Sequence, residues 1–486
     1  MTDSMMALAQ ATVNQALKAG ADYADVRVSR CSQEQMVLRN GVLAEADAPE
    51  DFGMGVRVLK NGCWGFAAAP GRPSELGDVA PGLARRAFKA ARDLAPVRHE
   101  PVELAGVEGH VGEYVTPMEQ DPFRVSLNEK LDILRAADAG MRGAESVVVR
   151  EASLSLRRTE QWQASSEGAA IHQVQVRTGA GIAVTAAANG TVERRSYPAS
   201  FGGQYQARGF ELVHEMDLAG NAERIRDEAV ALCSAPLCPA GERTLILGGS
   251  QLMLQIHESV GHPSELDRAM GSEVDLAGAS FLTTDKLGTF QFGSPQVTLT
   301  ADSTIAGGLD TRGYDDECVP SGRWPIVDRG QFVGYHTNRE WAQTIDEPAS
   351  RGTARGTGWF SPPIVRITNL SLEPGDWKLD ALLADTEDGA IFADGVRTWS
   401  IDQRRVNFQF TCEVAYEIQG GRLGRMLRQP TYQGQSTNFW RSCDAVCGPE
   451  EWQLWGVPNC GKGNPMQVAE MSHGAAPARF RGVSFL

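Results

Sequence analysis

The first half of the chain carries both helical and strand-like patterns of apolar residues. Apolar positions recur at helical spacing in four segments, which predicts helices over residues 3–19, 74–94, 125–141 and 219–234. Apolar and polar residues alternate over residues 23–69 and 146–207, as in strands that bury one face. Two-residue hairpin turns are expected at Asn40-Gly41, Asn61-Gly62 and Asn189-Gly190. This half is therefore expected to combine helices with an antiparallel sheet.

The second half differs, because short apolar runs are interrupted by Gly, Pro and Asp and few helical periods occur. Strands are expected over residues 296–301, 325–328, 332–336, 364–370 and 408–418. This pattern is typical of a barrel- or sandwich-like β domain. Residues 233–241 contain two prolines and a glycine and are predicted to link the halves. The sequence thus predicts an α+β protomer of two domains, residues 1–235 with mixed helices and antiparallel sheet and residues 236–486 mostly β.

One short motif in the second domain can carry chemistry. Residues 257–262 read His-Glu-Ser-Val-Gly-His. Two imidazoles can bind a metal ion and Glu258 can handle a water proton, which is what a zinc hydrolase needs. The spacing is one residue longer than the H-E-x-x-H of zinc proteases. The alternative is a chance pairing of two histidines.

The longer spacing requires a distorted backbone. On an ideal helix, residues five apart lie about 140° apart around the axis, too far for two ligands of one metal. A π-bulge or the end of the helix would bring them together, and Gly261 and Pro263 favour such a distortion. The helix before the motif is expected to begin at Ser250, a suitable N-cap.

A catalytic zinc site needs a third protein ligand. The candidates are Glu265, Asp267, Cys460 and His473. Cys460 lies in a glycine-flanked loop, where Lys462 can favour the thiolate, although a buried Cys is often only a small apolar residue. Cys443 and Cys447 form a C-x-x-x-C pair without a second pair at structural-site spacing. The residues alone leave the third ligand open.

Composition narrows the classes of function. Asp and Glu number 61 against 46 Lys and Arg, a net charge of −15, which disfavours direct nucleic-acid binding. We find neither a run of about 20 apolar residues nor a signal-peptide pattern, so no membrane association is expected. The nine cysteines are odd in number and scattered, as in a reduced cytoplasmic protein.

Several segments together resemble the TldD/PmbA family of metalloproteases, also called modulators of DNA gyrase, and within it the TldD branch. The likeness covers most of the chain and is most specific at residues 257–267. Further similar blocks, in the same order, are residues 24–28, 314–317, 334–335, 365–369 and 460–463.

This resemblance implies one zinc per chain, bound by His257, His262 and Cys460, with Glu258 as general base. It implies unfolded or precursor peptides as substrates, held as an added strand in an enclosed cleft. It also implies a dimer, either of two copies or with an inactive paralogue that lacks the histidine motif. Because this chain keeps the motif, it resembles the active subunit.

Other residues near these blocks are assigned roles from their chemistry. Glu265 is expected to orient an imidazole by accepting its second N–H, and Asp267 is left open. Tyr335, His336 and Arg366 are conceivable oxyanion donors, but a structural role is favoured. The pairs Arg404-Arg405 and Arg351, Arg355 are interpreted as solvated or structural charge.

The expected activity is therefore zinc-dependent peptide hydrolysis. One alternative is a regulatory interaction protein with a structural metal at the same residues. Another is a cysteine hydrolase that uses Cys460 and a histidine, and such an enzyme would survive chelation but not thiol alkylation.

Overall fold

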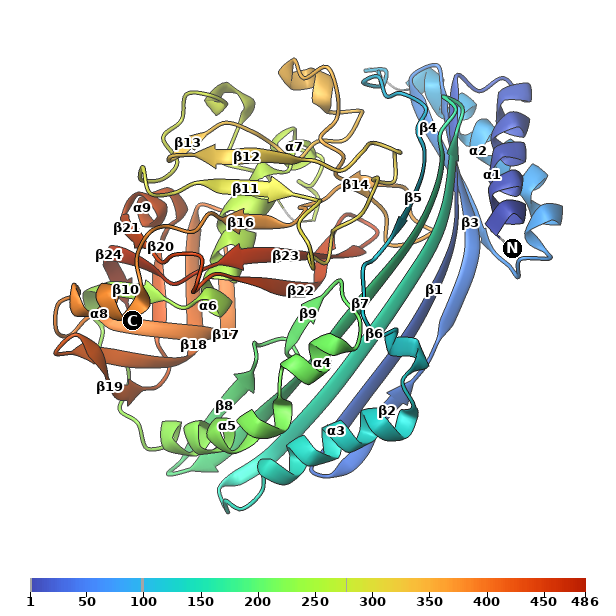
Figure 1. Cartoon of the computed structure of the whole chain (residues 1–486). Coiled ribbons are helices and arrows are strands. Elements are labelled where there is room, and N and C mark those ends of the chain that lie inside the picture. Colours follow the sequence, from blue (N-terminus) through green and yellow to red (C-terminus); the bar gives the residue numbers. More distant parts are fainter. Residues whose placement is uncertain (1, 98–99, 277) are drawn as a thin grey trace.

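This computed structural model describes residues 2–97, 100–276 and 278–486. A long curved sheet packs along one side of the C-terminal half with its concave face (Figure 1). Its nine strands include the path β4-β3-β1-β6-β7-β5. They are β1 (Tyr23–Arg39), β2 (Val42–Asp47), β3 (Glu50–Lys60), β4 (Cys63–Pro70), β5 (Val111–Val115), β6 (Val147–Ser165), β7 (Ala170–Ala188), β8 (Thr191–Tyr197) and β9 (Gln204–Gln206). All pairings are antiparallel except β5 with β7.

Three of the connections are the predicted Asn-Gly turns. Both turn residues have positive φ in each, at 51° and 81° for Asn40-Gly41, 50° and 71° for Asn61-Gly62, and 55° and 73° for Asn189-Gly190. Such turns match the twist of paired strands, and Asn and Gly tolerate this backbone region best.

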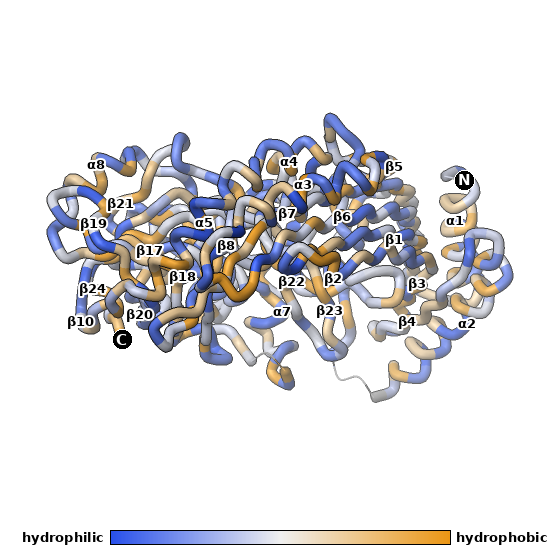
Figure 2. Tube along the Cα trace, turned by 90° about the horizontal axis from the view of Figure 1, so that it is seen from below, coloured by the Kyte–Doolittle hydropathy of each residue, from blue (hydrophilic) through white to orange (hydrophobic). Residues whose placement is uncertain are grey.

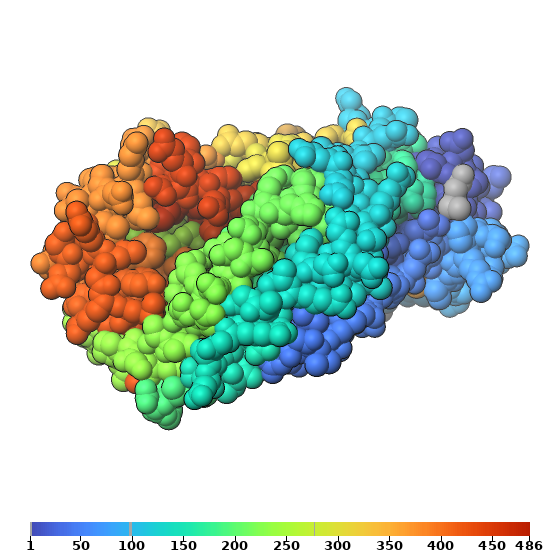
Figure 3. Space-filling model, turned by 60° about the horizontal axis from the view of Figure 1, so that its bottom comes forward, coloured from blue at the N-terminus to red at the C-terminus, as the bar shows by residue number. Residues whose placement is uncertain are grey.

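Hydrophilic and hydrophobic residues alternate along the long strands (Figure 2). Because successive side chains of a strand point to opposite faces, the two sets lie on different faces of the sheet. Even-numbered residues of β1, β6 and β7, such as Val26, Leu154 and Ile182, are buried against helices on the convex face. Odd-numbered residues, such as Arg27 and Arg177, face the C-terminal half. The helices are α1 (Thr2–Lys18), α2 (Leu76–Leu94), α3 (Leu127–Gly140), α4 (Glu211–Glu215) and α5 (Leu218–Leu232). Figure 3 shows α3 and α5 lying across this outer face.

The C-terminal half is built around a five-stranded barrel. The strands β10 (Gly241–Leu247), β17 (Ile391–Ile401), β18 (Asn407–Gln419), β20 (Thr431–Gln435) and β24 (Ala478–Phe485) follow one another, and β24 pairs back with β10. Two more strands extend this sheet, β19 (Arg422–Leu427) and β21 (Cys443–Val446). The fold class is therefore α+β, with a barrel in the second half, as predicted. The chain passes from α5 to β10 through residues 233–240, and the boundary at residue 235 stays a prediction.

Smaller units cover the barrel. A four-stranded sheet contains β13 (Gln331–Phe332), β12 (Arg323–Asp328), β11 (Leu299–Asp302) and β16 (Leu370–Leu372). Two hairpins are β14 (Ala354–Arg355) with β15 (Ile364–Val365), and β22 (Gln453–Lys462) with β23 (Gln467–Ala475). The helices are α6 (Gly249–Ile256), α7 (Leu266–Ala269), α8 (Leu379–Ala384) and α9 (Ser436–Arg441). Among the described residues, no helix is long and apolar enough to cross a membrane.

Three strand predictions in this half were too long. The strand expected over residues 296–301 begins only at Leu299. The strand expected over residues 332–336 ends at Phe332, because His336 instead pairs with the segment after the histidine motif, accepting from the Leu266 N–H and donating to the Ser264 carbonyl. The strand expected over residues 364–370 is split into β15 and β16, which join different sheets.

Candidate metal centre

The two motif histidines lie on one face because the helix widens between them. Helix α6 continues into the π-turn η3 (His257–Gly261) and the 3₁₀ turn η4 (His262–Ser264). The N–H of His262 donates to the carbonyl of His257, five residues earlier, and the two ring centroids lie 4.7 Å apart. This is a π-bulge, one of the two distortions that the spacing predicted. Gly261 has an ordinary φ of −58°, and a Cβ there would lie 2.9 Å from the Ile367 side chain. Close packing against Ile367, and not backbone freedom, therefore favours a glycine at this position.

The start of α6 differs from the prediction. The residue at the N-cap is Gly248, not Ser250. Asp394 of the barrel strand β17 supplies the cap instead, because its Oδ1 accepts from the Gln251 N–H at 3.1 Å and from Ser250 Oγ at 2.7 Å. The motif helix is thus fixed to the barrel wall by a carboxylate from another element.

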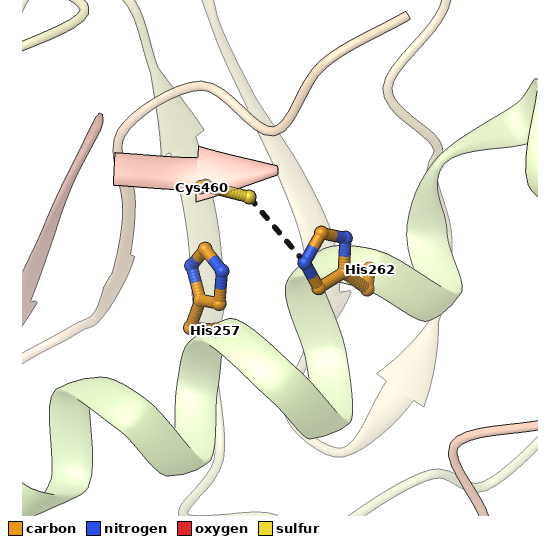
Figure 4. A group of neighbouring side chains, drawn as sticks. All are labelled: His257, His262 and Cys460. Carbon is orange, nitrogen blue, oxygen red and sulfur yellow. Dashed lines mark hydrogen bonds between the residues drawn. The ribbon is translucent and has the colours of Figure 1, made fainter. Parts of the chain in front are cut away.

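Cys460 of β22 completes a cluster with the two histidines (Figure 4). Ligand atoms of His257, His262 and Cys460 all lie within 4.8 Å of one another, and all three side chains are buried. The Sγ of Cys460 lies 3.5 Å from Nε2 of His262. Burial raises the pKa of this thiol, but His262 and Arg366 outweigh burial and leave the pKa below its ordinary value. The cluster therefore favours a thiolate beside two imidazoles.

Hydrogen bonds fix which nitrogen of each histidine is free. His473 has Nδ1 2.8 Å from the Leu370 carbonyl, which can only accept, so Nε2 of His473 accepts from Nδ1 of His257 at 2.8 Å. Nδ1 of His262 donates to Oε2 of Glu265 at 2.9 Å. Both motif histidines therefore keep the lone pair of Nε2 for a cation. His473, a candidate ligand from the sequence, orients His257 instead.

A buried lysine connects this centre to a second layer of charge. Nζ of Lys462 lies 2.7 Å from Asp267 Oδ1, 3.2 Å from Glu265 Oε1 and 2.7 Å from the Val365 carbonyl. Burial raises the pKa of Glu265, but Lys462 and His262 outweigh burial and lower the pKa well below its ordinary value. The sequence suggested that Lys462 favours the Cys460 thiolate, whereas its direct partners are these two carboxylates.

We expect Lys462→Met to lower the free energy of unfolding by about 3–5 kcal/mol, because the change leaves two buried carboxylates without their ammonium partner. Lys378→Met is a matched control, since Lys378 forms an exposed pair with Glu450 at 3.6 Å and such pairs contribute about 0–1 kcal/mol. Urea unfolding of both variants measures the difference. A loss in Lys462→Met no larger than in the control would contradict the assigned role.

Glu258 forms an ion pair with a residue that the sequence did not single out. Its Oε2 accepts from Nη1 of Arg405, and both side chains are largely buried. Burial raises the pKa of Glu258, but Arg405 and the two motif histidines outweigh burial and lower it. Arg405 sits at φ 65° in a turn held by Asp402, which accepts the N–H groups of residues 404, 406 and 407. Of the two interpretations of Arg405, solvated or structural charge, these contacts favour structural charge.

Models of three domains of one peptidase family match the chain. The PmbA/TldA metallopeptidase domain 1 matches residues 24–95, the central domain residues 120–232, and the C-terminal domain residues 241–483. The chain belongs to the PmbA/TldA metallopeptidase family. This confirms the resemblance to TldD/PmbA proteins that the motif blocks indicated.

Individual relatives agree with the family. A metalloprotease of Methanocaldococcus jannaschii is 29% identical over 91% of this chain and 92% of its own length. The metalloprotease TldD homolog of Haemophilus influenzae is 26% identical over 91% of this chain and 88% of its own length. TldE from Thermococcus kodakarensis has the same fold, with a TM-score of 0.74 at 16% identity over 99% of both chains. The structure of a Thermotoga maritima protein has a TM-score of 0.75, at 17% sequence identity and with 98% of each chain covered.

The conceivable oxyanion donors of this PmbA/TldA protein have structural partners. The hydroxyl of Tyr335 donates to the Leu282 carbonyl at 2.8 Å. Arg366 donates to the carbonyls of Cys460 and Gln467 and so anchors the strand that carries the thiol. Nδ1 of His336 lies 3.2 Å from Ser264 Oγ. These contacts agree with the structural roles that the sequence favoured.

We expect the stability of the fold to decrease at acid pH because of the buried side chain of His336. Burial lowers its pKa to about 4 from the ordinary 6.5. A depressed histidine pKa gives stability that is present above pH 6.5 and is lost as the pH falls towards 4. We expect the free energy of unfolding to fall by about 2 kcal/mol more between pH 7 and pH 5 in the wild type than in His336→Gln. Urea unfolding at both pH values tests this, and equal losses would contradict it.

Proposed function

We propose that this metallopeptidase family member is a zinc-dependent peptidase that hydrolyses unfolded or precursor peptides, with Glu258 as general base. One observation carries the proposal: the lone pairs of two histidine Nε2 atoms and the sulfur of Cys460 face one another within 4.8 Å, beside a buried carboxylate. A set of two imidazoles and one thiolate suits zinc, with one ion per chain.

Each residue then has a defined task. His257, His262 and Cys460 would hold the ion, and their partners His473, Glu265 and Arg366 fix their orientation. When bound, zinc supplies a Lewis acid that polarises the scissile carbonyl and makes water more acidic. The Glu258 carboxylate takes a proton from water and passes one to the leaving amine. The ion pair with Arg405 keeps this carboxylate ionised and fixed in place.

A cavity of about 350 Å³ on the concave face of the sheet offers an approach for a peptide. Phe201 lines it and packs edge-on against Trp399, with ring centroids 5.4 Å apart. The Trp399 side chain also helps to lower the pKa of Glu258, so the cavity lies close to the proposed base. The cavity also reaches β2, which pairs only with β1 among the described strands and has exposed side chains. A free strand edge can bind an extended peptide through its backbone.

The assembly we propose is a dimer, of two copies or with a paralogue lacking the motif. Exposed apolar residues gather near both ligand-bearing segments, with Met270, Val274 and Leu276 after α7, and Phe360 and Met466 beside a cavity of about 610 Å³. Light scattering of the purified protein measures its oligomeric state.

We also propose a cytoplasmic location. All nine cysteines are free, which fits a reducing compartment.

Chelation tests the proposed chemistry. We expect a zinc chelator to abolish cleavage of an unfolded peptide, and added zinc to restore it. Activity that survives chelation but is lost after thiol alkylation would instead support a cysteine hydrolase. Bound zinc without any peptide cleavage would support a structural metal in an interaction protein.

A further inference from the structure

A second buried cluster of charge lies between the concave face of the sheet and the C-terminal half. Arg157 of β6 and Arg177 of β7 enter it from the sheet, and Arg312, Arg355 and Glu470 enter it from the other side. They line a cavity of about 60 Å³. Since one water occupies about 30 Å³ in the liquid, this space fits a group as small as a carboxylate or sulfate.

Positive charge exceeds negative charge in this cluster. The four guanidinium groups face two carboxylates, because Nη1 of Arg157 lies 2.5 Å from Glu470 Oε1, and Asp310 Oδ1 lies 2.9 Å from Arg355 and 3.4 Å from Arg312. A third carboxylate, Asp316, is paired with Arg27 at 2.6 Å. Within this set of side chains, the guanidinium groups therefore outnumber the carboxylates by two.

The titration of two members agrees with this excess. Burial raises the pKa of Glu470, but Arg157, Arg177 and Arg355 outweigh burial and lower it to about 2. The pKa of Arg355 falls to about 10, chiefly because of burial, and Asp310 only partly offsets this while Arg312 and Arg366 lower it further. The neighbouring guanidinium groups of Arg312 and Arg366 thus add to the effect of burial on this pKa.

Donors in the cluster are also left over. Arg177 is buried, and in the described part of the protein only its Nε donates, to the Leu309 carbonyl at 2.8 Å. The Nε atoms of Arg157, Arg312 and Arg355 have no hydrogen-bond partner among the described residues, and neither have the two carboxylate oxygens of Asp310. Buried hydrogen-bond donors nearly always have a partner. This cluster can therefore bind a further group that accepts hydrogen bonds.

We propose that this pocket binds a small oxyanion, with the terminal nitrogens of Arg177 as its principal donors and the charges of Arg312 and Arg355 in support. A fork of two N–H groups matches the geometry of a carboxylate or sulfate. The bound anion completes the charge balance between the two halves. The strand β23 forms one wall, and its residue Ala469 is the register partner of Cys460. The pocket therefore adjoins the metal-bearing hairpin, but its binding does not depend on the metal.

The anion has two possible sources, a free ion or the carboxylate of a bound peptide. Titration calorimetry of the full chain at constant ionic strength, with sodium sulfate as one probe, tests the first. A short peptide with a free C-terminal carboxylate, compared with its C-terminal amide, tests the second. We expect saturable binding of sulfate, of the peptide acid over the amide, or of both. Absence of saturable binding in both arms would overturn the proposal.

Variants separate the pocket from general salt effects. We expect Arg177→Gln to weaken binding at least about tenfold, and Arg177→Lys to weaken it less because charge remains without the fork. Arg158→Gln is the matched control, because Arg158 is the next residue after Arg157 on β6 but pairs with Asp121 on the convex face at 2.6 Å. If Arg177→Gln does not fold, Arg177→Lys still decides. Equal binding by the wild type and the Arg177 variants would contradict the assignment.

Discussion

Glu258→Gln is expected to lower the rate of peptide cleavage by about 10²–10⁴-fold while leaving the metal content unchanged. The amide has nearly the same shape as the carboxylate but cannot accept the proton from water. Because Glu258 lies outside the cluster of His257, His262 and Cys460, the variant should still bind one zinc per chain. The measurement combines cleavage of an unfolded peptide with elemental analysis by mass spectrometry.

Two controls make this result specific. Glu450→Gln is the same change at an exposed position and should leave the rate unchanged. Arg405→Gln removes the partner of Glu258 but keeps the carboxylate, so it should retain more activity than Glu258→Gln. If Glu258→Gln cleaves peptides as fast as the wild type, then Glu258 is not the base. If it loses zinc, its role is to support the metal.

His262→Ala and Cys460→Ser are expected to lose the bound zinc and, with it, all peptide cleavage. Each change removes one of three protein ligands, and loss of a thiolate or an imidazole from such a set greatly weakens zinc binding. Metal content by mass spectrometry, with the wild type near one zinc per chain, is the direct readout. Circular dichroism checks that the variants remain folded.

Controls of the same residue types lie outside the centre. His214→Ala changes an exposed histidine, and Cys443→Ser changes a buried thiol whose partner is the Ala445 carbonyl. Both should keep their zinc. A wild-type protein that binds no zinc, even after reconstitution, would refute the proposed centre. Zinc retained by both His262→Ala and Cys460→Ser would place the ion elsewhere.

Local physics made much of the fold predictable. The Asn-Gly turns, the helices before and after them and the alternating strands depend on residues that are close in the chain. A distorted backbone was also predictable, because the five-residue spacing of His257 and His262 fits one metal only if the helix widens or ends between them. The structure decided that the helix widens. Even here the reason for Gly261 was missed, since it depends on Ile367 from another segment.

The sequence by itself determined the α+β class, the motif and the need for a distorted backbone within the motif. The likeness of the sequence to family blocks singled out Cys460. Only the tertiary structure decided which side chains form hydrogen bonds and ion pairs with the residues of the motif. Arg405 pairs with Glu258 across 147 positions, and His473 with His257 across 216, while Asp394 caps the motif helix from the barrel. Such contacts depend on how β17, β18 and the β22–β23 hairpin pack around α6. Periodicity and spacing describe only neighbours along the chain, so they carry no signal for these pairs.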